Sequence, residues 1–303
     1  MKRREMLLTT GLAALGLSAF PWRRAAAADQ AKRKLLMFTK SSSFEHSVAK
    51  RTDGELSHNE RIMTELGREH GFDVVCTKDG AVFDGDLDQY DAFFFYTTGD
   101  LTQSGTDKQP PMTAQGKQRL LAAVAAGKGF LASHCGSDTF HSAGPRREEQ
   151  EKKDDYIAML GGEFIRHGPQ QQARQKIVDK NFPGFDQISP AAVVEGEFLI
   201  NDEWYSLKNF ADDMHVLLVM DTQGMKGEDY ERPPYPSTWI RRHEKGRVFY
   251  TSMGHREDVW TNKDFQNMLL GGLAWAFGDA DYEVTPNIKQ VAPGAHVMPP
   301  PVK

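Results

Sequence analysis

The stretch Gly129-Phe130-Leu131-Ala132-Ser133-His134-Cys135-Gly136 decides the fold that this sequence predicts. Its first half is a short apolar run without alternation, which is typical of a strand buried on both faces of a parallel sheet. The run ends at His134, and Gly136 follows two positions later, a spacing that suits a tight strand-to-helix turn. A helix that starts there offers free backbone N–H groups beside the turn. We therefore expect the functional site at His134.

Comparable apolar runs alternate with helical patterns along the rest of the chain. Predicted strands cover residues 34–38, 72–76, 91–96, 130–133, 177–179, 197–200, 215–220 and 247–253. Predicted helices cover residues 57–70, 118–126, 156–160 and 264–277. This alternation predicts an α/β fold with a doubly wound, mostly parallel sheet and helices on both faces. The binding crevice of such sheets lies beyond the carboxyl ends of the strands, so we look near residues 41–46, 97–100 and 134–141.

The composition is that of an ordinary globular protein. The 303 residues are 39% hydrophobic and 26% charged, with a net charge of -5, which gives no reason to expect a nucleic-acid partner. A run of about 20 apolar residues is absent, so we expect no stable insertion into a membrane. The two cysteines, Cys76 and Cys135, are too few for a disulfide framework.

Residues 1–28 have the features of an export signal. Lys2, Arg3 and Arg4 precede an apolar stretch, and four alanines at 25–28 provide small residues for cleavage. The paired arginines resemble a twin-arginine signal, which predicts a periplasmic or extracellular location. The alternative is an uncleaved anchor, because Arg23 and Arg24 are unusual so close to a cleavage site. We expect one α/β domain over residues 29–280 and a Pro-rich tail, extended or disordered, over residues 281–303.

An ordered set of motifs extends from about Leu35 to Phe277. It comprises Phe44-Glu45-His46, Gly129 to His134 with Ser137-Asp138-Thr139, Gly161-Gly162-Glu163-Phe164 with His167, Asp202-Glu203-Trp204-Tyr205, His215-Val216-Leu217, Trp239, Gly246 to Tyr250, Gly254-His255, Leu270-Gly271-Gly272 and Trp275-Ala276. The set resembles the ThuA-like, or trehalose-utilisation, family, which has a class I glutamine amidotransferase-like fold. The resemblance implies a flavodoxin-like sheet and a role in carbohydrate metabolism, on glucosides, disaccharides or their 3-keto derivatives. It also implies that His46, His134, His167 and His255 line the pocket.

The resemblance argues against glutaminase chemistry. Class I amidotransferases carry a cysteine nucleophile at the apex of the strand-to-helix turn, and this chain has His134 there. An imidazole cannot form the glutamyl thioester of that reaction. Cys135 follows the apex and would point into or along the helix.

Our first hypothesis is a carbohydrate-processing enzyme of the hydrolase, lyase or isomerase type. His134 and His255 would be acid/base or metal-binding groups, supported by Glu203 and Asp138. The expected substrate-binding residues are His46, His167, Trp204 and Tyr205.

A divalent metal such as Zn also suits the four histidines at 46, 134, 167 and 255, with Asp138 and Glu203 completing the site or orienting the rings. Asp138 has a simpler interpretation as a carboxylate that stabilises the first helical turn, and core packing is the simpler interpretation of Trp204 and Tyr205.

Two rival functions stay open. One is a non-catalytic sugar-binding protein that uses the same pocket, and the other is a redox-responsive protein that uses Cys135. A small-molecule carbohydrate is the expected partner in the first two hypotheses, and the sequence leaves open a homo-oligomer.

Overall fold

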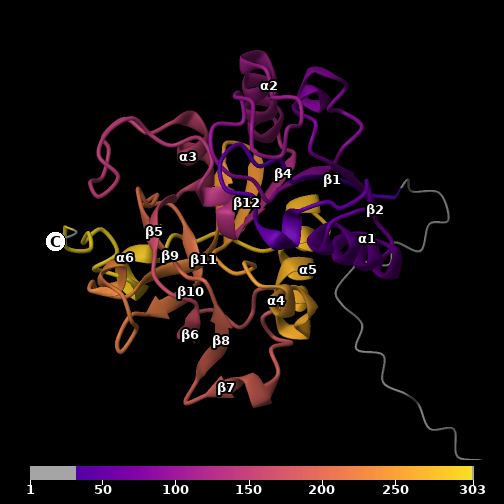
Figure 1. Cartoon of the computed structure of the whole chain (residues 1–303). Helices are drawn as coiled ribbons and strands as arrows, with labels where there is room; N and C mark the ends of the chain where they lie inside the picture. Colours follow the sequence, from indigo (N-terminus) through magenta and orange to yellow (C-terminus); the bar gives the residue numbers. More distant parts are fainter. Residues whose placement is uncertain (1–31, 302–303) are drawn as a thin grey trace, which may run out of the picture.

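The computed structural model of the chain describes residues 32–301 (Figure 1). The predicted signal at residues 1–28 lies outside this part of the chain. Within the described residues, no helix has the length and apolar character that crossing a bilayer requires.

The described chain forms strands and helices in an alternating order that becomes strand-rich after residue 160. The strands are β1 (Lys34–Phe38), β2 (Asp73–Thr77), β3 (Ala92–Phe95), β4 (Gly129–Ser133), β5 (Glu163–His167), β6 (Gln171–Ile177), β7 (Val193–Val194), β8 (Glu197–Asp202), β9 (Tyr205–Lys208), β10 (His215–Asp221), β11 (Tyr235–His243) and β12 (Gly246–Thr251). The α-helices are α1 (His58–His70), α2 (Ala114–Ala125), α3 (Asp155–Leu160), α4 (Glu257–Thr261), α5 (Lys263–Phe277) and α6 (Ile288–Val291).

A ten-stranded mixed sheet organises the fold, in the order β2-β1-β3-β4-β12-β11-β10-β6-β8-β7. The pairs from β2 to β12 are parallel, and the pairs from β12 to β7 are antiparallel. The prediction of an α/β fold is confirmed, whereas a mostly parallel sheet is wrong for the second half. That half lacks long crossover helices between its strands, and short connections favour antiparallel pairing.

The parallel half matches the expected apolar runs. Every residue of β3 and β4 is buried, because helices cover the sheet and leave no solvated face. Helix α5 contacts β4 and β12, and α3 also contacts β12. Figure 1 shows α2 and α3 together, apart from the group of α1, α4 and α5. The doubly wound path of the chain stays a prediction.

Four strands were not predicted from the sequence, among them the two-residue β7 at the edge of the large sheet. β11 contains Pro236 and ends in Arg241-Arg242-His243. A proline and charged residues are not typical of an inner strand, although β11 lies between β12 and β10. β5 and β9 pair with each other in a separate two-stranded sheet. This small sheet places His167 opposite Tyr205. The predicted strand at residues 177–179 is also displaced, since β6 ends at Ile177.

The turn after β4 is tighter than predicted. His134 has φ of +46°, in the left-handed region that non-glycine residues rarely adopt. It begins a 3-10 helix over His134–Ser137 rather than an α-helix. A Cβ on Gly136 would lie 2.6 Å from the Cβ of Ala132, so the turn needs glycine there. Such strain costs about 1–3 kcal/mol and is concentrated at functional sites.

The described part of the tail packs on the domain. Ile288 and Ala295 are buried, and the Asn287 side chain bonds both backbone groups of Val216 in β10. Arg232 donates to the carbonyl of Ala295. These contacts hold the segment of residues 287–295 against the domain, which agrees better with the extended than with the disordered alternative for the tail.

Candidate functional site

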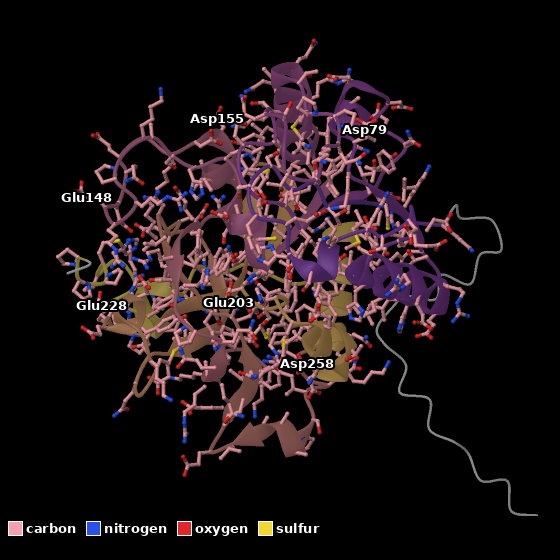
Figure 2. All side chains as sticks on the ribbon, viewed as in Figure 1. Asp79, Glu148, Asp155, Glu203, Glu228 and Asp258 are labelled. Atoms are coloured by element: carbon pink, nitrogen blue, oxygen red, sulfur yellow. The ribbon has the colours of Figure 1, made fainter. Side chains whose placement is uncertain are left out.

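Four side chains that could hold a metal ion meet at the carboxyl end of the parallel strands. His46, His134, Glu203 and His255 each offer one ligand atom, and these four atoms lie within 4.8 Å of one another. We call these four residues the histidine–glutamate cluster. Figure 2 shows Glu203 near the middle of the molecule, while Glu148 and Glu228 lie toward its margin.

The topology explains why residues so far apart in sequence meet. His46 lies in the segment after β1, His134 directly follows β4, and His255 follows β12. Parallel strands end at the same edge of a sheet, so these three segments converge. Glu203 comes from the antiparallel half, directly after β8.

The separations within the cluster suit a small divalent ion. Nδ1 of His255 lies 3.3 Å from Nε2 of His134 and 3.2 Å from Oε1 of Glu203. Nε2 of His134 lies 3.7 Å from the same Glu203 oxygen. Two ligands of a tetrahedral ion with bonds of about 2.0–2.1 Å lie about 3.3–3.4 Å apart. The cluster therefore has the spacing of ligands around one ion.

A hydrogen bond to the backbone orients the His134 ring for metal binding. Nδ1 of His134 lies 3.0 Å from the backbone carbonyl of Ser252. A carbonyl can only accept, so in the neutral ring Nδ1 carries the hydrogen and Nε2 presents its lone pair to the cluster. Metal-binding histidines are typically oriented in this way.

His46 presents a buried nitrogen that lacks a partner. Its side chain is 3% exposed, and Nδ1 makes no hydrogen bond. Burial, followed by the nearby charges of His134 and His255, lowers the pKa of His46 well below its ordinary value. His46 is therefore neutral and available as a ligand at neutral pH.

Glu203 supplies the negative charge of the site. Burial alone would raise its pKa, but the neighbouring imidazoles of His134 and His255 hold the pKa of this carboxyl well below its usual range. The same contact acts on His255 in the opposite direction, since Glu203 raises the pKa of His255 despite burial. An ionised carboxylate among three imidazoles is a ligand set that zinc and similar ions accept.

Asp202 holds two parts of the site together. Its carboxylate accepts hydrogen bonds from the backbone N–H groups of Gly254 at 2.7 Å, Glu203 at 2.9 Å and Arg256 at 3.3 Å. The side chain thereby fixes the end of β8, which carries Glu203, to the turn that carries His255. Burial raises the pKa of Asp202, against the lowering effects of His134 and these backbone donors.

Comparison with known proteins agrees with this architecture. The sequence profile of the ThuA family, described as trehalose utilisation, matches residues 34–276. The chain belongs to the ThuA family. No functionally curated protein matches its sequence.

Two solved structures share the ThuA fold. A ThuA-like protein from Bacteroides uniformis has 15% identity and a TM-score of 0.56, covering 88% of this chain and 99% of that one. A ThuA-like protein from Parabacteroides merdae has 18% identity and a TM-score of 0.55, covering 89% of this chain and 97% of that one. The family resemblance drawn from the motifs is confirmed, and this fold agrees with the expected glutamine amidotransferase-like architecture.

The structure of this ThuA-family protein brings together most of the site residues expected from the sequence. His46, His134, Glu203 and His255 form the cluster. His167 lies beside it, with Nδ1 3.3 Å from Oε2 of Glu203 and its side chain 45% exposed. The four expected metal ligands were His46, His134, His167 and His255. Glu203, predicted as a supporting group, takes the place of His167 among the four.

The expected aromatic residues lie deeper than a sugar-binding surface requires. Trp204 is completely buried and donates to the carbonyl of Gln171, so the core-packing interpretation holds for it. Tyr205 is also buried, with its ring centroid 4.0 Å from that of His134 and 4.1 Å from that of Phe164. Tyr205 packs against the His134 ring, and its hydroxyl lies 3.5 Å from Nε2 of His46.

Asp138 belongs to a neighbouring network. Its Oδ1 lies 2.7 Å from Nε2 of His141, whose Nδ1 lies 3.2 Å from Oε1 of Glu163. Glu163 also accepts from Ser142 and Asn209. His141 lies in the expected crevice segment 134–141 and Glu163 in a family motif, but neither was assigned a role, although the three-residue spacing of Asp138 and His141 could have suggested a contact within one turn.

His141 predicts a pH-dependent contribution to stability. Burial alone would lower its pKa, but hydrogen bonds to Asp138 and Glu163 raise it above the usual value of 6.5. The contribution is thus fully present below pH 6.5 and is lost as the pH rises through the folded-state pKa. We expect His141→Gln to lower the free energy of unfolding more at pH 6 than at pH 9, as measured by urea unfolding. An equal loss at both pH values would contradict this assignment.

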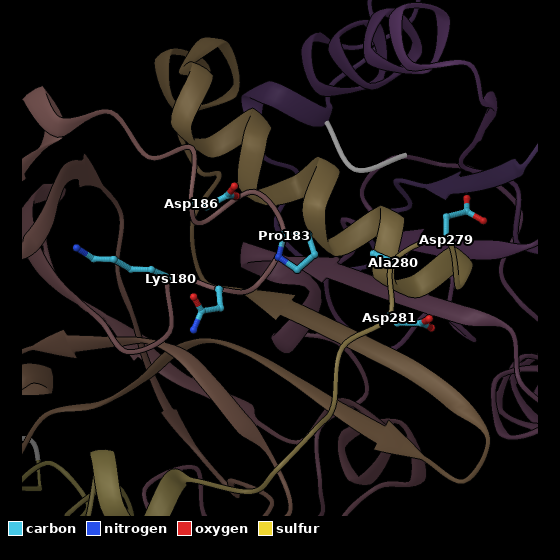
Figure 3. A pocket seen from close by; sticks show the side chains of 7 residues that line it. Lys180, Pro183, Asp186, Asp279, Ala280 and Asp281 are labelled. Atoms are coloured by element: carbon cyan, nitrogen blue, oxygen red, sulfur yellow. The ribbon is translucent and has the colours of Figure 1, made fainter. Parts of the chain in front are cut away.

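A separate cavity lies away from the cluster. It has a volume of about 510 Å³ and lies between the loop of residues 180–186 and the segment of residues 279–281 that follows α5 (Figure 3). Asp279 on its wall is paired with Arg33 at 2.7 Å. Because its lining includes no residue of the cluster, we do not place the active site there.

Proposed function

We propose that this ThuA-family protein processes carbohydrates at a divalent-metal centre formed by His46, His134, Glu203 and His255. The observation that carries the proposal is the convergence of these four ligand atoms within 4.8 Å. The family's description, trehalose utilisation, supports a glucoside, a disaccharide or a 3-keto derivative as substrate.

The donor set fits a metal better than it fits a simple acid–base pair. His46 carries a buried nitrogen without a partner, and the His134 tautomer presents a lone pair to the cluster. Zinc is the ion that three imidazoles and one carboxylate suit well. Such an ion would act as a Lewis acid for a sugar carbonyl or hydroxyl, or lower the pKa of a bound water.

His167 is the residue that we propose for proton transfer. Its Nδ1 lies 3.0 Å from the carbonyl of Gly168 and 3.3 Å from the Glu203 carboxylate. Both partners accept, so Nδ1 carries the hydrogen in the neutral ring and Nε2 is the basic nitrogen. The half-exposed side chain leaves His167 accessible to a substrate, unlike the buried His46 and His134.

These roles suit elimination from a 3-keto-glucoside. The ketone acidifies the hydrogen on the neighbouring C2 carbon, and Nε2 of His167 removes it as a proton. The electron pair forms the C1=C2 double bond and expels the glycosidic oxygen, which receives the proton back from His167. Water can then add to the double bond, so that the overall reaction is hydrolysis. A positioned base typically contributes about 10²–10⁴-fold to such a step.

Metal analysis of the purified mature protein, paired with a panel of 3-keto-glucosides, tests the proposal. We expect about one divalent ion per chain, together with turnover that a chelator abolishes and added metal restores. Protein that contains no stoichiometric ion and turns over the panel regardless of chelator would contradict the metal centre. Calorimetry that detects sugar binding without turnover would favour the non-catalytic sugar-binding alternative.

The export signal predicted at residues 1–28 is also part of this proposal. We propose that residues 1–28 direct export to the periplasm or the extracellular space, where a small-molecule carbohydrate is the partner. Fractionation of cells that produce the full chain and a variant with Arg3 and Arg4 replaced by lysine tests this location.

A further inference from the structure

We propose that Phe44 is a stacking platform for a sugar ring at the rim of the histidine–glutamate cluster. This inference rests on the proposed function and deepens it, because it names a residue that would select ring-shaped saccharides. Phe44 is 64% exposed. The other exposed large apolar side chains in residues 32–301 are valines, Val194 at 46% and Val297 at 52%.

The position of Phe44 distinguishes it from an incidental surface residue. Its ring centroid lies 4.9 Å from that of His46, in an edge-to-face arrangement. The His46 ring in turn lies 5.0 Å from His134 and 5.2 Å from His255. The exposed Phe44 ring therefore packs directly against one member of the cluster, on the side that faces solvent.

The backbone beneath Phe44 is held in place. Its carbonyl accepts a hydrogen bond from the Thr98 hydroxyl at 2.8 Å, and the hydroxyl oxygen of Thr98 in turn accepts from the N–H of Ser43 at 3.3 Å. The carbonyl of Ser43 accepts from the Thr106 hydroxyl at 2.5 Å. A fixed backbone presents the exposed ring to solvent at little further cost in conformational entropy when a ligand binds.

Within residues 32–301, Phe44 is the exposed large apolar side chain that carries an aromatic ring. Trp204, Tyr205, Trp239 and Trp260 are all buried, so they cannot offer a face to a sugar. A pyranose presents apolar C–H groups on its face and hydroxyl groups at its edge. Phe44 would contact the face, and half-exposed His167 and the cluster would meet the polar edge.

A series of replacements at Phe44 tests whether its ring contacts the bound sugar. Calorimetry with trehalose and with methyl 3-keto-glucoside measures Kd for the metal-loaded wild-type protein, Phe44→Trp, Phe44→Leu and Phe44→Ala. We expect Phe44→Ala to weaken binding by about tenfold, Phe44→Leu to fall between, and Phe44→Trp to bind at least as tightly as wild type. Acyclic sorbitol should distinguish none of them. In turnover assays KM should rise while kcat changes little, because Phe44 touches no reacting atom.

Val297→Ala is the matched control, since it removes an exposed apolar side chain elsewhere and should leave every Kd unchanged. Wild-type binding together with equal Kd values across the Phe44 series would overturn the platform and leave the proposed function intact. Loss of self-association in Phe44→Ala, with unchanged Kd, would likewise overturn it in favour of a protein contact. If the wild-type protein binds none of the sugars, the proposed function itself fails and the platform fails with it.

Discussion

Replacing Glu203 by glutamine is expected to remove most of the bound metal and to lower turnover by about 10²–10⁴-fold. Glutamine keeps the size of the side chain but removes the charge. Glu203 lies 3.2 Å from His255 through one oxygen and 3.3 Å from His167 through the other. The substitution therefore affects both a proposed ligand and the group that orients the proposed base.

Asp138→Asn is the matched control for this experiment. Both carboxylates were expected from the sequence to support His134 and His255, but the bond that Asp138 makes at 2.7 Å is to His141. We expect Asp138→Asn to retain its metal and its turnover while losing stability at low pH. Metal content by mass spectrometry of the elements and turnover of 3-keto-glucosides are measured for both variants. Full metal occupancy in Glu203→Gln would remove Glu203 from the ligand set.

The location of the site could be predicted from where the apolar runs of the sequence end. His134 and His255 each end an apolar run, and the rule for parallel strands places both at one edge of the sheet. The same rule covers His46, which lies in the loop after β1. These three predictions needed only the direction of the strands, which the alternation of strands and helices conveys.

The parts of the site that depend on antiparallel pairing could not be predicted in this way. Glu203 reaches the cluster from β8, whose place in the sheet depends on pairing with β6. The position of His167 depends on the pairing of β5 with β9, a small sheet that the residue pattern does not predict. Neither position can be derived from local periodicity, because long-range packing decides it.

Burial also decided which aromatic residues could serve the site. Trp204 and Tyr205 stand beside Glu203 in sequence, and their type suggested contact with sugar. Both pack inside the protein. Phe44, which belongs to the motif Phe44-Glu45-His46 and for which no role was predicted, is exposed. Residue type alone does not distinguish these cases, since a large apolar side chain contributes to the core unless the backbone holds it outside.

Asp202→Asn is expected to reduce metal affinity by about 10–100-fold, although Asp202 is not a member of the cluster. The buried carboxylate accepts from three backbone N–H groups and joins the turn of His255 to the end of β8. An asparagine amide keeps one acceptor oxygen and turns an NH₂ group toward a backbone donor. At least one buried donor then lacks an acceptor, which costs about 1–3 kcal/mol and lets the turn shift.

Asp264→Asn separates this positioning effect from general destabilisation. Asp264 is also buried, at 8% exposure against 0% for Asp202, and accepts from the backbone N–H of Ser189 at 2.8 Å, at the start of α5. Both substitutions should lower the melting temperature, but only Asp202→Asn should weaken metal binding, as measured by competition with a chromogenic chelator. If metal affinity falls equally in both variants, Asp202 acts through stability alone. If it falls in Asp202→Asn and the proton-transfer step keeps its pH profile, Asp202 sets the geometry of the metal ligands and leaves His167 unaffected.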